Sequence, residues 1–101
     1  MAFVRIASTS DVPAGEVRVF EIEGRSLALA NVGGEYLAIE NVCTHDGGPL
    51  GDGTLWDARV ECPRHGARFD LRTGRAITLP AVRGVQTYRV QVEGHDVQVE
   101  V

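Results

Sequence analysis

Short segments in which apolar and polar residues alternate cover much of the chain and predict β-strands. The clearest alternation runs from Tyr88 to Glu93 and, after a turn at Gly94-His95, again from Val97 to Val101. Two alternating arms around a turn predict a half-buried hairpin, because successive side chains of a strand point to opposite faces. Gly33-Gly34 is a second hairpin signal. Further strands are predicted over residues 16–22, 26–32, 35–40 and 58–61.

No segment of the chain has the periodicity of a helix. No stretch places apolar residues at i, i+3, i+4 and i+7 over three turns, and one short turn within residues 10–15 is all we expect. The sequence therefore predicts an all-β fold, a sandwich or small barrel of short antiparallel strands. Its 101 residues fit a single domain spanning residues 1–101.

Two irregular segments interrupt this pattern and carry the candidate chemistry. The first covers about residues 41–55 and is rich in glycine, and the second covers about residues 62–70. Each holds one cysteine and one histidine, and sixteen residues separate the two pairs. Soft thiolates together with imidazoles predict a metal site. The candidate ligands are Cys43, His45, Cys62 and His65.

The order of these ligands separates two kinds of metal site. Zinc sites built from two cysteines and two histidines usually pair like with like along the chain, whereas each segment here supplies one of each. The mixed order fits a 2Fe–2S cluster in which one iron takes two thiolates and the other takes two imidazoles. A zinc-stabilised binding module is the alternative that the residues leave open.

Both segments resemble the ligand loops of the Rieske ferredoxins, the small electron carriers of bacterial ring-hydroxylating oxygenases. The resemblance covers nearly the whole chain and rests on residues 43–50 (CTHDGGPL) and 62–70 (CPRHGARFD), followed by residues 71–76. It implies a Rieske-type β-sandwich with a two-loop cluster-binding subdomain, and one 2Fe–2S cluster on the four ligands. The residues that it places around the cluster are Gly47, Gly48, Pro63, Gly66, Ala67, Phe69 and Pro80.

Four positions near the ligands indicate a low reduction potential for this family. High-potential members that the chain resembles carry two extra cysteines, which bridge the loops, and a serine and a tyrosine whose hydroxyls bond to sulfur. The matching positions here are Gly48, Arg64, Ala67 and Phe69. Hydrogen bonds to sulfur stabilise the reduced cluster, so their loss lowers the potential.

The resemblance implies an electron carrier and not an enzyme. Such a carrier takes one electron from an NAD(P)H-dependent flavoprotein reductase and passes it to a terminal oxygenase, with the imidazole edges of His45 and His65 as the exit. The chain is also too short to contain the mononuclear-iron domain of a terminal oxygenase. The alternative function is a Rieske-like small subunit of a nitrite-reductase-type complex.

Charge and composition narrow the partners and the location. The formal net charge of −4 disfavours nucleic acid and anionic membranes as partners. No apolar run approaches the ~20 residues that a membrane-spanning helix needs. With two cysteines and no recognisable export signal, we expect a soluble, cytoplasmic protein that is monomeric in isolation.

The remaining notable residues have simpler interpretations. We expect Trp56 to pack in the core, with shielding of the cluster edge as the alternative, and His95 to be an exposed turn residue. Charged residues near the two segments are expected to form a solvated rim, with partner docking as the alternative. These are Asp46, Asp52, Asp57, Glu61, Arg64 and Arg68.

Overall fold

The computed structural model describes residues 2–42, 48–63, 66–78 and 83–101. These residues form β1 (Phe3–Ser8), η1 (Thr9–Asp11), β2 (Val17–Ile22), β3 (Arg25–Val32), β4 (Glu35–Glu40), η2 (Leu50–Asp52), β5 (Thr54–Trp56), β6 (Arg59–Glu61), β7 (Arg68–Asp70), β8 (Thr87–Tyr88), β9 (Val90–Glu93) and β10 (Asp96–Glu100), where η marks a 3₁₀ helix. Within these ranges, no helix has the length and apolar character that crossing a membrane requires.

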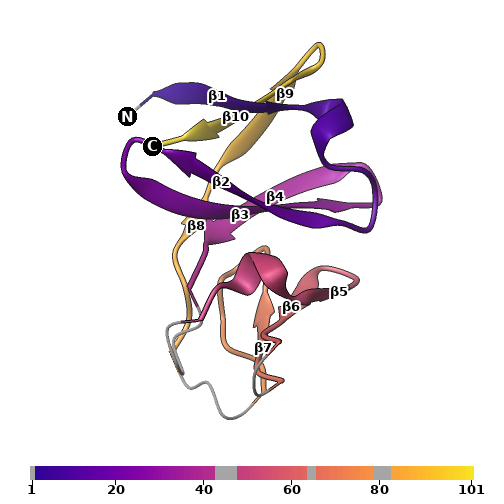
Figure 1. Cartoon of the computed structure of the whole chain (residues 1–101), viewed down its shortest axis with the longest axis vertical. Helices are drawn as coiled ribbons and strands as arrows, with labels where there is room; N and C mark the ends of the chain where they lie inside the picture. The colour runs from indigo at the N-terminus through magenta and orange to yellow at the C-terminus, as the bar shows by residue number, and fades with distance from the viewer. Residues whose placement is uncertain (1, 43–47, 64–65, 79–82) are drawn as a thin grey trace.

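The strands form three antiparallel sheets, which lie one below another in Figure 1. The first has the order β1-β10-β9, the second β2-β3-β4-β8, and the third β5-β6-β7. The four-stranded sheet lies between the other two and packs against both. The third sheet therefore sits at one end of the molecule, beside the segments that were predicted to hold a metal.

β3 shows why the middle sheet can support two cores. Leu27 and Leu29 pack with residues of the first sheet, whereas Ala28 and Ala30 pack with residues of the third. All four side chains are fully buried. A strand that is buried on both faces has a continuous apolar sequence in place of alternation, and the run LALA of β3 is of this kind.

Each core has a distinct set of buried residues. The base core, between the first and middle sheets, consists of Ala7, Val12, Leu27, Leu29, Ala38, Val97 and Val99. The loop core, between the middle and third sheets, consists of Ala28, Ala30, Ile39, Leu50, Val60, Cys62, Ala67, Phe69 and Leu71. Cys62 is the predicted metal ligand that the described structure places within a core.

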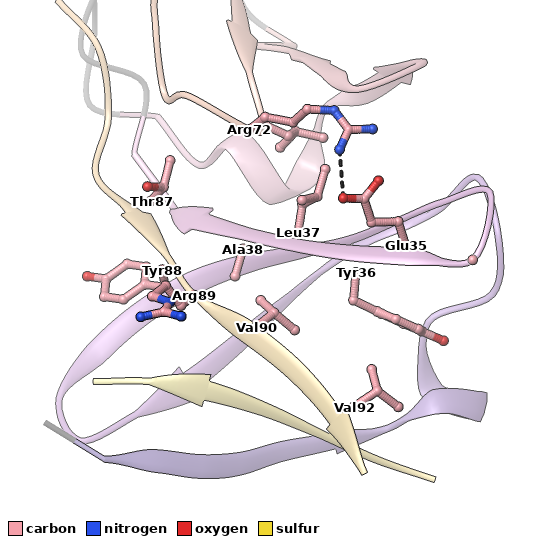
Figure 2. Close-up of a pocket in the computed structure, with 12 residues that line it drawn as sticks. Glu35, Tyr36, Leu37, Ala38, Arg72, Thr87, Tyr88, Arg89, Val90 and Val92 are labelled. Atoms are coloured by element: carbon pink, nitrogen blue, oxygen red, sulfur yellow. Dashed lines mark hydrogen bonds and ion pairs between the residues drawn. The ribbon is translucent and has the colours of Figure 1, made fainter. Parts of the chain in front are cut away.

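The turn after β7 attaches the third sheet to the middle sheet. Leu71 is buried in the loop core, and Arg72 donates a hydrogen bond of 2.6 Å from Nη1 to Oε2 of Glu35, at the start of β4. This hydrogen bond and the charge of Glu35 raise the pKa of the Arg72 guanidinium. Figure 2 shows the pair beside a groove that β4 forms with Val90 and Val92 of β9.

The prediction of an all-β fold with short antiparallel strands is confirmed, with corrections to its details. The predicted strands at 16–22, 26–32, 35–40 and 58–61 correspond to β2, β3, β4 and β6. The second ligand segment is shorter than predicted, because β7 already begins at Arg68. β1 was not predicted; it lies beside β10, almost the whole chain length away in sequence.

Candidate metal centre

Cys62 directly follows β6, and its side chain is buried in the loop core at 1% exposure. The chain returns at once into β7, and two hydrogen bonds close the loop between these strands. The Cys62 N–H donates to the carbonyl of Ala67 at 2.7 Å, and the Gly66 N–H donates to the carbonyl of Cys62 at 3.2 Å. The thiol is thus held at the end of a hairpin whose strands belong to a packed sheet.

Gly66 allows this hairpin loop to close. Its φ of +74° lies in the left-handed region, where side chains with a Cβ are strained. A Cβ built at Gly66 would meet no described atom within 4 Å. The described part of the protein therefore requires glycine here for its backbone conformation and not for lack of space.

The peptide N–H of Ala67 is a buried donor that has no acceptor among the described residues. Ala67 is fully buried, and no residue in the described ranges accepts a hydrogen bond from its N–H. In a regular hairpin the carbonyl of Cys62 would accept it, but here that carbonyl accepts from Gly66. Because more than nine in ten buried N–H groups are paired, an unpaired donor beside a buried thiol fits a site that supplies sulfur acceptors.

The segment that follows the first pair of predicted ligands is anchored on the middle sheet. Asn41 receives a hydrogen bond of 2.7 Å at Oδ1 from the Gly51 N–H and donates one of 3.0 Å from Nδ2 to Oγ of Ser26 in β3. Gly53 lies against β6 so closely that a Cβ there would be 2.0 Å from the carbonyl oxygen of Glu61. η2 is therefore fixed at a defined position relative to both the middle and the third sheets.

The described structure contains part of the predicted site. Cys62, Ala67 and Phe69 are brought together in the loop core, and Gly48 is also buried, whereas Pro63 is exposed. Apart from Gly66 of the hairpin loop, the other predicted site residues lie outside the described residues, so the complete ligand set stays a prediction. These are Cys43, His45, Gly47, His65 and Pro80, together with Asp46 and Arg64 of the predicted rim.

Two residues that support the site were missed in the sequence. Asn41 precedes the first predicted cysteine by two positions, and an asparagine before a glycine-rich stretch could have been read as a turn anchor. Thr78 contacts the loop between β6 and β7 through its hydroxyl. No periodic pattern marks Thr78, because its partners are ten and twelve residues away in the chain.

The expectation that Trp56 packs in the core is wrong. Its side chain is 49% exposed on the outer face of the third sheet, where the Arg68 guanidinium lies 5.1 Å from the centre of the indole ring. Arg68 also donates a hydrogen bond of 2.9 Å from Nε to Oε1 of Glu61. These two members of the predicted rim thus pair with each other, while His95 is an exposed turn residue, as predicted.

Comparison with known proteins gives consistent matches over most of the chain. The family model described as "Rieske [2Fe-2S] domain" matches residues 2–89. The ferredoxin component of a naphthalene 1,2-dioxygenase system from Pseudomonas aeruginosa is 41% identical over 90 residues, which are 89% of this chain and 86% of that protein. The ferredoxin component of a biphenyl 2,3-dioxygenase from Rhodococcus jostii is 41% identical over 100 residues, or 99% of this chain and 94% of that protein.

Solved structures give the same result. The ferredoxin of carbazole 1,9a-dioxygenase from Nocardioides aromaticivorans superposes with a TM-score of 0.93 at 33% identity, over 98% of this chain and 97% of that chain. A structure titled as a complex of reduced oxygenase and oxidized ferredoxin in carbazole 1,9a-dioxygenase matches with a TM-score of 0.90 at 32% identity, over 96% and 91% of the two chains. A putative nitrite reductase small subunit, at 19% identity and a TM-score of 0.87, shares the fold alone.

Proposed function

The chain belongs to the Rieske [2Fe-2S] domain family, and we propose that it carries single electrons, at a low potential for this family, from an NAD(P)H-dependent flavoprotein reductase to a terminal oxygenase. One observation in the structure supports this proposal above the others: the hairpin between β6 and β7 holds a buried thiol, Cys62, beside a buried amide, Ala67 N–H, that has no acceptor in the described residues. The family match and this donor favour a 2Fe–2S cluster over the zinc module. The named relatives, which are ferredoxin components of dioxygenase systems, favour the oxygenase carrier over the nitrite-reductase subunit.

We assign the cluster to Cys43, His45, Cys62 and His65. When bound, the 2Fe–2S group supplies a one-electron couple, and imidazole ligation places Rieske centres at about −150 to +300 mV, above plant-type ferredoxins at about −400 mV. The chain contributes the two thiolates and two neutral imidazoles, and the loop core around Cys62 excludes water from one side of the site. The N–H of Ala67 is available to a sulfur acceptor, where it would favour the reduced state.

The surroundings of Cys62 support the low potential. Ala67 and Phe69 share the loop core with Cys62, and neither side chain has a hydroxyl that could donate to sulfur. Gly48 and Arg64 stand where a bridging disulfide would need cysteines. A midpoint potential well above about +100 mV at neutral pH, in the upper part of the Rieske range, would contradict this part of the proposal.

The partners follow from the relatives. The carbazole 1,9a-dioxygenase ferredoxin is described in complex with its oxygenase, and we propose an equivalent oxygenase as the electron acceptor of this chain. A flavoprotein reductase is the proposed donor. We further propose one domain over residues 1–101, a monomer in isolation and a cytoplasmic location, because the two cysteines of the chain, both proposed as cluster ligands, suit a reducing compartment.

Anaerobic reconstitution with iron and sulfide tests the cluster and its ligands. The native sequence should bind two irons and two sulfides per chain and give a Rieske-type EPR signal on reduction. His65→Ala should abolish that signal, whereas His95→Ala, which changes an exposed turn residue, should leave it intact. A colourless, zinc-containing protein would contradict the cluster, and a normal Rieske spectrum from His65→Ala would contradict the ligand assignment.

Electron transfer itself is tested by rapid mixing of the reduced protein with an oxygenase. Reduced native protein should reoxidise when mixed with the terminal oxygenase of its own system, and an NAD(P)H-dependent reductase should reduce it again. Stable, stoichiometric copurification with a large reductase subunit would instead favour the nitrite-reductase type of complex.

A further inference from the structure

We propose that Thr78 is a positioning residue of the cluster site, whose hydroxyl fixes the peptide between Gly66 and Ala67 and thereby raises the reduction potential. This inference rests on the proposed function. It concerns a residue outside both ligand segments and outside the set implied by the family resemblance.

Residues 76–78 run beside β7 without forming a regular strand. Ala76 forms a bridge with Phe69, and the Ile77 N–H donates to the carbonyl of Arg68 at 2.8 Å. At Thr78 the side chain forms the hydrogen bonds to this region. Its Oγ1 accepts a hydrogen bond of 2.9 Å from the Arg68 N–H and donates one of 3.4 Å to the Gly66 carbonyl. The hydroxyl therefore joins the start of β7 to the loop that carries the second pair of predicted ligands.

A hydroxyl is suited to this position because it can donate and accept at once. The Arg68 amide needs an acceptor and the Gly66 carbonyl needs a donor, and Thr78 serves both in a half-buried environment. An apolar side chain of the same shape would leave both backbone groups without this partner. Backbone groups that lose a partner away from bulk water tend to shift until they find another one.

The peptide group couples this contact to the site. The Gly66 carbonyl and the Ala67 N–H belong to one planar trans peptide, so they point in opposite directions and turn together. Gly66 has the broadest backbone freedom of any residue type, and its φ of +74° lies where only glycine is unstrained. A hydrogen bond that holds the Gly66 carbonyl therefore also fixes the direction of the Ala67 N–H.

The Ala67 N–H is the buried donor that finds no acceptor in the described part of the chain. A donor to sulfur stabilises the extra negative charge of the reduced cluster, and a donor that can turn away stabilises it less. The expected consequence of losing the Thr78 hydroxyl is a lower reduction potential together with a broader EPR signal, because several peptide orientations would coexist.

Redox titration of two matched variants in the reconstituted protein tests the inference. Thr78→Val keeps the shape of the side chain and removes both hydrogen bonds, whereas Thr78→Ser keeps the hydroxyl. In Thr78→Val, the hydrogen bond from the Ala67 N–H to sulfur should lose part of its usual strength, which lowers the equilibrium constant for reduction about threefold. For a one-electron couple, this change lowers the reduction potential by ~28 mV. Thr78→Ser should titrate within experimental error of the native protein.

Tyr36→Phe controls for general destabilisation. It also removes one hydroxyl, which donates 2.9 Å to the carbonyl of Thr9 beside the base core, at the other end of the molecule. This variant should melt at a lower temperature than the native protein and keep the native potential. A shift of the potential in Tyr36→Phe equal to that in Thr78→Val would overturn the positioning role.

The outcomes separate this inference from the proposed function. A native protein without a Rieske signal defeats the proposed function. A native Rieske signal with an unchanged potential and line shape in Thr78→Val defeats the inference alone. If Thr78→Val still unfolds cooperatively but cannot keep its cluster, a loaded Thr78→Ser protein with native potential supports the inference, and an unloaded one overturns it.

Discussion

At the scale of single residues, Phe69 and Ala67 affect both the packing of the loop core and the reduction potential of the site. Both side chains are fully buried in the loop core together with Cys62. Phe69 is among the largest fully buried side chains. A tyrosine ring at this position would fill the same space and add one hydroxyl group. Among the described residues, Ala67 and Phe69 therefore form an apolar wall beside the thiol, and the donor that they provide there is the backbone N–H of Ala67.

Phe69→Tyr tests this view of the wall. If the new hydroxyl reaches a sulfur of the cluster, the reduced state gains about 1 kcal/mol of hydrogen bonding, which corresponds to roughly 40 mV higher potential. Redox titration followed by EPR measures the shift, and Phe20→Tyr, at a half-buried ring beside the base core, is the control that should not change it. An unchanged potential with a lower unfolding temperature would mean that the hydroxyl is buried without a partner.

The sequence predicted the chemistry of the site better than its hydrogen bonding. The order of Cys43, His45, Cys62 and His65 indicates a mixed-ligand cluster, because ligand type and spacing are local properties of the chain. The lack of an acceptor for the Ala67 N–H in the described part of the chain could not be predicted, because such a donor is recognised only after the acceptors around it have been placed. Thr78 was missed for the same reason.

At the scale of elements, the turn after β7 holds the third sheet on the middle sheet through two neighbouring residues of different kinds. Leu71 is 1% exposed within the loop core, whereas Arg72 forms an ion pair with Glu35 in which both side chains are 50% exposed. Buried apolar area is a larger source of stability than an exposed ion pair, which loses its gain to solvent screening and side-chain entropy.

Replacing each of these residues by alanine should give very different results. Leu71→Ala should lower the free energy of unfolding by about 2–5 kcal/mol, the usual range for a buried leucine. Arg72→Ala should leave the urea midpoint of the protein essentially unchanged. Equilibrium unfolding in urea, followed by far-UV circular dichroism, measures both. An equal loss of stability in the two variants would mean that the ion pair contributes to docking of the third sheet.

β2, β3 and β4, which pair with their neighbours in the sequence, were predictable, whereas β1, which pairs at long range, was not. β2, β3 and β4 follow one another through tight turns, so alternation and glycine turns indicate each of them. β1 pairs with β10 from the opposite end of the chain, and no local pattern specifies that partner. Trp56 was misplaced because a short strand of three residues does not show which of its faces is buried.

At the scale of the whole molecule, the middle sheet separates a base core that contains no predicted ligand from a loop core that includes one. β3 supplies Leu27 and Leu29 to the first core and Ala28 and Ala30 to the second. The base core is closed by Val97 and Val99 of β10, the central strand of its sheet. Both cores pack on the middle sheet, but the loop core includes a predicted metal ligand and the base core does not.

Removal of the cluster should therefore loosen one end of the protein and leave the other folded. After chelation under anaerobic, reducing conditions, amides of β3 and β10 should keep their protection from hydrogen exchange, because the base core contains no proposed ligand. The amides of Cys62 and Gly66, which bond only within the hairpin loop, should exchange at least tenfold faster than in the loaded protein. This follows because metal-site binding energy adds to the folding energy of the segments that provide ligands.

Hydrogen exchange followed by mass spectrometry or NMR on the loaded and cluster-free protein makes this comparison directly. Exchange of β10 that accelerates as much as exchange of the hairpin loop would show that the whole fold depends on the cluster, as in small domains that unfold without their metal. Unchanged exchange at Cys62 and Gly66 would show that the hairpin holds its conformation without the cluster. The hydrogen bonds of Thr78 with Gly66 and Arg68 would then suffice to keep the loop ready to receive it.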